Sequence, residues 1–151
     1  MDYRRFKHSR FSARFPENFR YSRSHYWMSG EGCEKGTWRV GFTKFATRML
    51  GELVEVQWNV AKGEVIDPGQ SIGPGEGFKS VSDFFSVMHG EFSTGNPVLE
   101  VDACIVRASP YLEGWLYEVR GEPEEVSLDI DGYIALLDAT ITKMQESGDY
   151  D

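Results

Sequence analysis

The chain has 151 residues, of which 40% are hydrophobic, 14% aromatic and 16 are glycines, so its length predicts one domain and its composition favours a β-rich fold with many turns. Its net charge of −8 argues against nucleic-acid binding by the whole chain. No run of about 18 apolar residues occurs, which excludes a transmembrane helix, and because the basic N-terminal stretch has no apolar core we expect no secretory signal.

Positive charge is concentrated at the N-terminus. Residues 1–28 carry seven basic and two acidic groups, a net charge of +5, so the remainder of the chain carries −13. Residues 1–18 mix charges with phenylalanines without a steady period, and we expect a basic arm that is partly ordered at best. Such an arm folds back on the acidic body, binds a partner, or remains a solvated tail.

Short strands and turns dominate the next part of the chain. The aromatic-rich residues 19–28 and the segment TWRVGF at 37–42 predict a hairpin across the glycine-rich stretch between them. Thr43 can cap a short helix over 44–50 that stops at Gly51. Alternating apolar residues in 53–58 indicate a half-buried strand, and residues 59–77 are rich in Gly and Pro, which predicts tight corners.

The C-terminal segment has a helical pattern instead. Apolar residues recur at steps of three and four between Ile130 and Met144, which predicts an amphipathic helix over 129–145 that begins at Asp129 or Asp131.

Catalytic and metal-binding patterns are weak. The three histidines and two cysteines lack the spacing of zinc ligands, so we expect no metal site. A thiol hydrolase could pair Cys33 or Cys104 with His25 or His89, although no local signature supports such an enzyme. Because the cysteines form no CxxC motif and no disulfide framework, we expect a cytoplasmic protein.

Lys79 stands out in the segment GPGEGFKSVSDFF at 73–85. It is the only lysine between Lys62 and Lys143, and it follows a glycine-rich corner that would let the chain turn sharply. This pattern predicts a lysine exposed at a hairpin tip. It fits a solubilising lysine as well as one presented to a modifying enzyme, and the pattern alone does not decide between them.

Four segments together resemble the glycine cleavage system H-protein family of lipoyl carriers. The first contains Tyr21, Ser22, His25 and Trp27, and the second is the block VGFTKFATRMLGELVEV at 40–56. The third, GEGFKSVSDFFSVMHGEF at 75–92, is similar to the lipoylation hairpin of the family, and the fourth is SPYLEGWLYEV at 109–119. The resemblance covers about residues 19–140, nearly the whole predicted domain.

The resemblance implies a mainly β fold, the barrel-sandwich hybrid of lipoyl and biotinyl carriers, with short helices and a C-terminal helix. The domain would span residues 19–151, after the arm at 1–18. Lipoic acid would be attached to Lys79 by an amide bond, flanked by Glu76, Gly77, Phe78, Ser80, Val81, Ser82 and Asp83. His25 and His89 would lie near the lipoyl head group, although ordinary strand histidines fit the sequence as well.

In this interpretation the protein is a monomeric, non-catalytic carrier subunit, without nucleic-acid or membrane partners. The lipoyl group would act as a swinging arm that moves intermediates and electrons between enzymes, after its attachment by a lipoate-attaching enzyme. A biotin carrier is the weaker variant, because biotin sites usually read M-K-M and this one reads F-K-S.

Departures from the family pattern bear on the pathway. The usual E-S-V-K-A is Glu76-Gly77-Phe78-Lys79-Ser80 here, the proline after Ser86 is absent, and a basic arm is added. These changes favour an H-like lipoate-binding protein of heterodisulfide-reductase-like sulfur oxidation. The alternative is a true H protein that carries the aminomethyl group among glycine decarboxylase, aminomethyltransferase and dihydrolipoamide dehydrogenase. An unmodified protein-interaction module is a further alternative.

Overall fold

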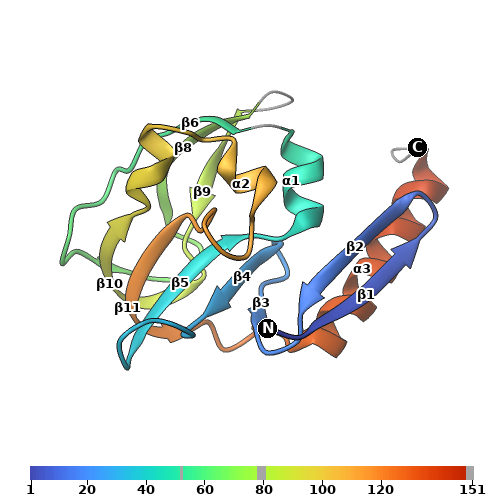
Figure 1. Ribbon diagram of the computed structural model, residues 1–151, viewed down its shortest axis with the longest axis horizontal. Helices are drawn as coiled ribbons and strands as arrows, with labels where there is room; N and C mark the ends of the chain where they lie inside the picture. The colour runs from blue at the N-terminus through green and yellow to red at the C-terminus, as the bar shows by residue number, and fades with distance from the viewer. Residues whose placement is uncertain (52, 78–80, 149–151) are drawn as a thin grey trace.

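The computed structural model describes residues 1–51, 53–77 and 81–148 (Figure 1). The helices among these residues are α1 (Lys44–Leu50), η1 (Pro97–Glu100, a 3-10 helix), α2 (Ile105–Ala108) and α3 (Ile130–Ser147). The strands are β1 (Tyr3–His8), β2 (Phe11–Pro16), β3 (Arg20–Tyr21), β4 (Tyr26–Ser29), β5 (Thr37–Phe42), β6 (Leu53–Val56), β7 (Val65–Ile66), β8 (Ser71–Gly77), β9 (Val81–Phe85), β10 (Met88–Gly95) and β11 (Tyr117–Pro123).

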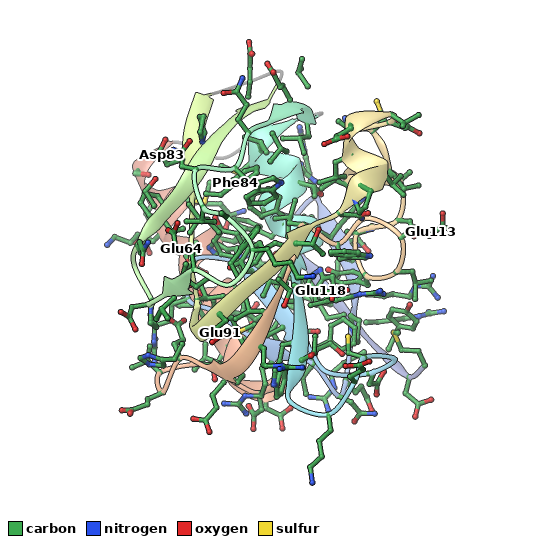
Figure 2. The ribbon with its side chains drawn as sticks, turned by 90° about the vertical axis from the view of Figure 1, so that its left-hand side faces the viewer. Glu64, Asp83, Phe84, Glu91, Glu113 and Glu118 are labelled. Atoms are coloured by element: carbon green, nitrogen blue, oxygen red, sulfur yellow. The ribbon has the colours of Figure 1, made fainter. Side chains whose placement is uncertain are left out.

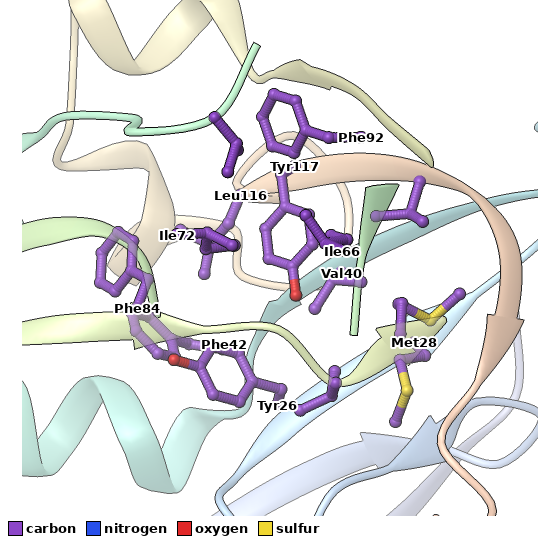
Figure 3. Close-up of a cluster of buried hydrophobic side chains, with 14 of the residues drawn as sticks. Tyr26, Met28, Val40, Phe42, Ile66, Ile72, Phe84, Phe92, Leu116 and Tyr117 are labelled. Carbon is purple, nitrogen blue, oxygen red and sulfur yellow. The ribbon is translucent and has the colours of Figure 1, made fainter. Parts of the chain in front are cut away.

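Two antiparallel sheets make the body of the molecule. One has the strand order β3-β4-β5-β11-β10-β7 and the other has the order β6-β8-β9. Buried side chains of both sheets meet in one cluster, which includes Met28, Val40 and Tyr117 from the larger sheet and Ile72 and Phe84 from the smaller one (Figure 3). The expectation of a mainly β sandwich with a C-terminal helix is therefore confirmed.

The N-terminal residues form an ordered hairpin, so the expectation of an arm that is partly ordered at best is wrong. β1 and β2 pair antiparallel with Phe6 opposite Ala13, and they make a separate two-stranded sheet. In Figure 1 this hairpin lies along α3, beside the sandwich. Phe6, Phe11 and Phe15 are buried because their strand positions all point towards the helix. The free energy gained by burying these rings offsets the conformational entropy lost when the segment becomes ordered.

A second hydrophobic cluster joins this hairpin, α3 and one edge of the body. It contains the three hairpin phenylalanines, Tyr21, Trp27, Phe45 and the inward face of α3, namely Ile130, Tyr133, Leu137 and Ile141. The Tyr133 ring stacks on Tyr21 with centroids 4.7 Å apart and meets Phe15 edge-on at 5.5 Å. The helical period seen in the sequence thus buries α3 against aromatic rings.

Both predicted helix starts are confirmed. Thr43 caps α1 by accepting a hydrogen bond from the Ala46 amide, and α1 ends at Gly51, whose φ is +82°. Asp129 caps α3 in the same way through the Gly132 amide. The predicted strand over 37–42 has the bounds of β5.

Candidate functional site

β8 and β9 flank the candidate attachment lysine on both sides. They pair antiparallel, and the last described pair is Glu76 with Val81, preceded by Gly75 with Ser82. On the other edge of β8, Gly77 pairs with Leu53 of β6. Phe78, Lys79 and Ser80 lie outside the described residues. The strands that lead to and from Lys79 are therefore direct neighbours in a three-stranded sheet, as in a hairpin.

Gly73 and Gly75 lie inside β8 and not at a corner, which corrects the expectation of a sharp turn before Lys79. Gly73 has a φ of +153°, and a Cβ there would stand 1.8 Å from the Gln57 carbonyl oxygen. A Cβ on Gly75 would stand 2.4 Å from the ring of Phe84. The absence of a side chain at both glycines therefore lets the Gln57 backbone and the Phe84 ring pack directly against β8. The corners predicted at Gly63 and Gly69 do occur, each with a φ of +86°.

Phe84 anchors this hairpin to the core. Its side chain is 2% exposed and its ring meets Phe42 at 5.3 Å and Trp58 at 5.8 Å between centroids. The next residue, Phe85, is 42% exposed, and its amide donates to the Tyr26 hydroxyl at 3.2 Å. Burial raises the pKa of Tyr26 to about 12, so this oxygen stays protonated and ties β9 to β4 of the other sheet. These contacts fasten β9 to the core and to the larger sheet.

Two carboxylates, Glu76 and Asp83, lie on the described strands of the hairpin. Glu76 at the end of β8 is exposed, and Asp83 on β9 accepts a hydrogen bond from Ser71 at 2.9 Å. In Figure 2 Asp83 lies on the hairpin, whereas Glu64, Glu91 and Glu118 are spread over the rest of that view. Glu76 and Asp83 place negative charge on the two strands of the hairpin, which suits approach to a partner of positive charge.

His25 is held inside the fold. Its Nδ1 lies 2.9 Å from the Tyr133 hydroxyl, and its ring packs on Phe45 with centroids 4.7 Å apart. The Tyr133 hydroxyl also lies 2.8 Å from Thr43 Oγ1, so one network joins α3, α1 and the β3–β4 turn. Burial lowers the pKa of His25 to about 4. These partners are those of a structural histidine, and its contact with a lipoyl head group stays a prediction.

His89 lies at the end of the hairpin that is remote from residues 78–80. It is the second residue of β10, which follows β9, and the five residues of β9 span about 13 Å. Its Nδ1 stands 3.5 Å from Asp67 on an exposed surface. A head-group contact for His89 therefore requires a long arm that folds back along β9, and it stays a prediction.

The alternative of a thiol enzyme gains no support from the geometry. The Cys33 thiol faces the Glu31 carbonyl at 3.7 Å, and burial raises its pKa, which opposes a reactive thiolate. No Cys–His hydrogen bond and no metal-binding group of three His, Cys, Asp or Glu residues occurs within the described ranges. No helix in that part of the chain is long and apolar enough to cross a membrane.

Comparison with known proteins decides the family. The model of the family "Glycine cleavage H-protein" matches residues 19–132. The chain belongs to the glycine cleavage H-protein family. The H protein of Streptomyces coelicolor is 37% identical over 126 residues, which cover 82% of this chain and 98% of that protein. The H protein of Edwardsiella ictaluri is likewise 37% identical, with 82% and 96% covered.

A solved structure of this family has the same fold. The crystal structure of a glycine cleavage system H protein from Mycobacterium marinum superposes with a TM-score of 0.70 and 31% sequence identity, and the match covers 80% of this chain and 97% of that one. H proteins carry lipoate covalently on a lysine. The predicted family, fold and cofactor class are thus confirmed.

Two features of this H protein were missed by the sequence analysis. One is the order of the hairpin β1–β2, which lies before the family match at residue 19. The phenylalanines at 6, 11, 15 and 19 were the available signal. Because Phe6 lies on one strand and Phe11 and Phe15 lie on the next, their spacing along the sequence does not show the alternation of a single strand. The other is the anchoring role of Phe84, which was missed because two adjacent phenylalanines in the sequence do not tell which one is buried.

Proposed function

We propose that this chain is the carrier subunit of a glycine cleavage system and that Lys79 bears its lipoyl group. The family match carries the proposal, because it spans residues 75–92, which resemble the lipoylation hairpin of the family, and Lys79 is the one lysine in that segment of the sequence. The pairing of Glu76 with Val81 supports it, since it brings both flanks of Lys79 to one exposed end of a sheet.

In this proposal the fold holds the two strands that flank Lys79 in place. The dithiolane of a bound lipoyl group supplies a disulfide that opens to a dithiol and so accepts a group or electrons. The protein around Lys79 holds the two flanking strands by Phe84 and by the Tyr26 hydroxyl, while Glu76 and Asp83 leave the hairpin end polar and hydrated. A tether on a fixed hairpin raises the effective concentration of the group at each partner.

The partners in this proposal are glycine decarboxylase, aminomethyltransferase and dihydrolipoamide dehydrogenase, with a lipoate-attaching enzyme that loads Lys79. We place the protein in the cytoplasm as a monomer, and the two free cysteines Cys33 and Cys104 suit a reducing compartment. The sequence analysis favoured sulfur oxidation with a heterodisulfide-reductase-like complex. The reported relatives support its alternative better, because their names are those of glycine cleavage H proteins.

Modification of Lys79 is the first test. Incubation of the whole protein with a lipoate ligase, ATP and lipoate should add one lipoyl group to the intact mass. Lys79→Arg should remove this gain, whereas the matched variant Lys62→Arg should keep it. A gain that persists in Lys79→Arg would refute the assignment of the site. An unmodified interaction module would show no gain in any variant.

Turnover tests the pathway. The lipoylated protein, mixed with the three partner enzymes, should support glycine-dependent formation of NADH, and Lys79→Arg should abolish it. If the lipoylated protein instead supports only a heterodisulfide-reductase-like complex, the glycine cleavage assignment is wrong while the attachment site stands.

A further inference from the structure

The outward side of the N-terminal hairpin adjoins α1 and α2, and together these elements carry six cations in a chain of net charge −8. One of them, Arg48 of α1, lies over the Phe11 ring, and the other five define one surface. We call this surface the basic face; it consists of Arg5 and Lys7 on β1, Arg14 on β2, Lys44 on α1 and Arg107 on α2. Arg5, Lys7, Arg14 and Arg107 are exposed and Lys44 is half-buried.

The basic face is one continuous hollowed surface. Three hollows of about 620, 310 and 260 Å³ lie over the hairpin, between the hairpin and α2, and between the hairpin and α1. They share lining residues, since Arg14 borders the first two and both Lys44 and Arg107 border the last two. No Asp or Glu lines any of the three.

A further hollow, over β5, β10 and β11, shows the contrast. It has about 500 Å³ and is lined by three cations and three carboxylates, which are Arg39, Lys62, Arg120, Glu34, Glu91 and Glu118. Arg39 and Glu118 already pair there at 3.0 Å. Local charge is balanced at that hollow and unbalanced on the basic face.

The two sides of the hairpin differ in the same way. On the side that faces α3, Arg4 pairs with Asp131, and His8 lies 3.0 Å from Asp138. On the outward side, the five cations of the basic face form no ion pair with any residue that the structure describes. The inward Arg4 is thus neutralised by its partner on α3, whereas the outward cations of the basic face are left available.

Arg5 and Arg14 stand directly opposite each other across the two strands. Opposed side chains of an antiparallel pair lie about 5 Å apart at Cβ, and like charges in that arrangement lower stability. The Arg14 guanidinium lies 5.3 Å above the Tyr3 ring, which orients it but does not offset its charge. An anionic surface placed over both arginines would relieve this repulsion.

The basic face lies near the strands that flank Lys79. α1 begins at Lys44, rises about 10 Å, and leads at Leu53 into β6, which pairs with Gly77 next to the candidate lysine segment. A partner on the basic face would therefore stand beside the hairpin that presents Lys79. The net charge of −8 disfavours a nucleic acid, and it disfavours a second copy of this chain by repulsion between equal charges.

We propose that the basic face is a docking surface for an acidic patch on a protein partner of the carrier. This inference rests on the proposed function, because it assigns the surface by which one of the enzymes that act on the group at Lys79 is engaged. The basic face would speed the encounter and fix the orientation in which the hairpin end meets that enzyme.

Charge reversal tests the basic face. Arg5→Glu turns the repulsive pair with Arg14 into an attractive one, so its melting temperature should equal or exceed that of the parent protein. Arg107→Glu reverses a cation on α2 and does not depend on the hairpin. Lys35→Glu, in the exposed β4–β5 turn, is the control with the same charge change. Binding of each full-length variant to the lipoate-attaching enzyme, glycine decarboxylase, aminomethyltransferase and dihydrolipoamide dehydrogenase is measured by biolayer interferometry at low and moderate salt.

For at least one enzyme, we expect Arg5→Glu and Arg107→Glu each to weaken binding about fivefold or more, mainly through a slower association rate, and to flatten the salt dependence. Lys35→Glu should bind as the parent does. Unchanged binding of both variants to all four enzymes overturns the proposal, as does the absence of binding by the parent protein.

The proposal is also overturned if the parent protein self-associates or binds duplex DNA, both variants abolish that binding, and their binding to the enzymes is unchanged. The mass gain at Lys79 is measured on the same samples, so loss of the proposed function is distinguished from loss of the docking surface.

Discussion

The two hydrophobic clusters of the molecule are built differently. In the sandwich cluster, the strands that supply the side chains are also joined to one another by backbone hydrogen bonds within the two sheets. In the hairpin–α3 cluster, β1 and β2 pair only with each other, and they meet α3 through aromatic rings and ion pairs. The sandwich therefore has a framework independent of its side chains, whereas the hairpin and α3 depend on side-chain contacts to stay together.

A few residues connect the two clusters. Phe11 of the hairpin meets Phe45 of α1 edge-on at 5.5 Å, and the Tyr133 hydroxyl bonds to Thr43 at the start of α1. Backbone hydrogen bonds between Tyr21 and Leu128 join β3 to the segment before α3. These links determine how much a substitution that destabilises one cluster also destabilises the other. The following variants test them.

Phe84→Ala should have the largest effect. The ring lies between the two sheets and covers Gly75, so its removal leaves a cavity that β8 cannot fill, and we expect a loss of about 4 kcal/mol in the free energy of unfolding. Urea denaturation followed by tryptophan fluorescence measures this loss. The neighbouring variant Phe85→Ala, at an exposed position, should cost less than about 0.5 kcal/mol. Equal losses in the two variants would contradict the anchoring role of Phe84.

Phe15→Ala tests the hairpin–α3 cluster. Phe15 is 0% exposed and contacts the rings of Phe6, Tyr21 and Tyr133, so we expect a loss of about 3 kcal/mol. Hydrogen exchange should speed up in β1, β2 and α3 while β5 and β11 stay protected. Ser12→Ala, at an exposed position of the same strand, serves as the control. Equal loss of protection in both regions would show that they form a single cooperative unit.

Acid should weaken the junction through His25. Its pKa is about 4 in the folded protein, below the usual value of 6.5, so between these two values the unfolded chain binds more protons. Its contribution to stability is complete above pH 6.5 and is lost as the pH falls towards 4, by about 3 kcal/mol at most.

His25→Asn tests this assignment, because asparagine tolerates the positive φ of +72° and does not titrate. Thermal melts from pH 7 to 4 should show a shallower decline in the variant. Parallel declines in the variant and the parent protein would refute a role for His25.

Tyr133→Phe should have the smallest effect. It removes the hydroxyl that bonds to Thr43 and His25 and keeps the stacked ring, so we expect a loss of about 1 kcal/mol. The melting temperature measures it, with Tyr3→Phe, a half-buried tyrosine of the hairpin, as the control. A loss as large as that of Phe15→Ala would mean that the polar network, and not the packed rings, joins α3 to the body.

Local signals in the sequence determined the elements of this protein. The helix 44–50 was predicted from Thr43 and Gly51, and the C-terminal helix from its apolar period and Asp129, because caps and periodicity are properties of a few adjacent residues. The family likewise followed from motifs in the right order along the chain. Lys79 was singled out by its segment, and the structure describes only its flanks.

Tertiary structure alone decided where those elements meet. Residues 1–18 were predicted to be a partly ordered arm because the cluster that buries their phenylalanines is completed by α3, more than 100 residues away, and by Phe45. Gly73 and Gly75 were predicted to form a corner, yet they are strand residues. Any side chain at these positions would collide with Gln57 or Phe84. Only the fold shows that His25 is bonded to Tyr133 of α3, more than 100 residues away, while its contact with a lipoyl head group stays a prediction. A sequence records which residues are apolar or small, but burial, pairing and unbalanced charge arise between segments that are distant along the chain.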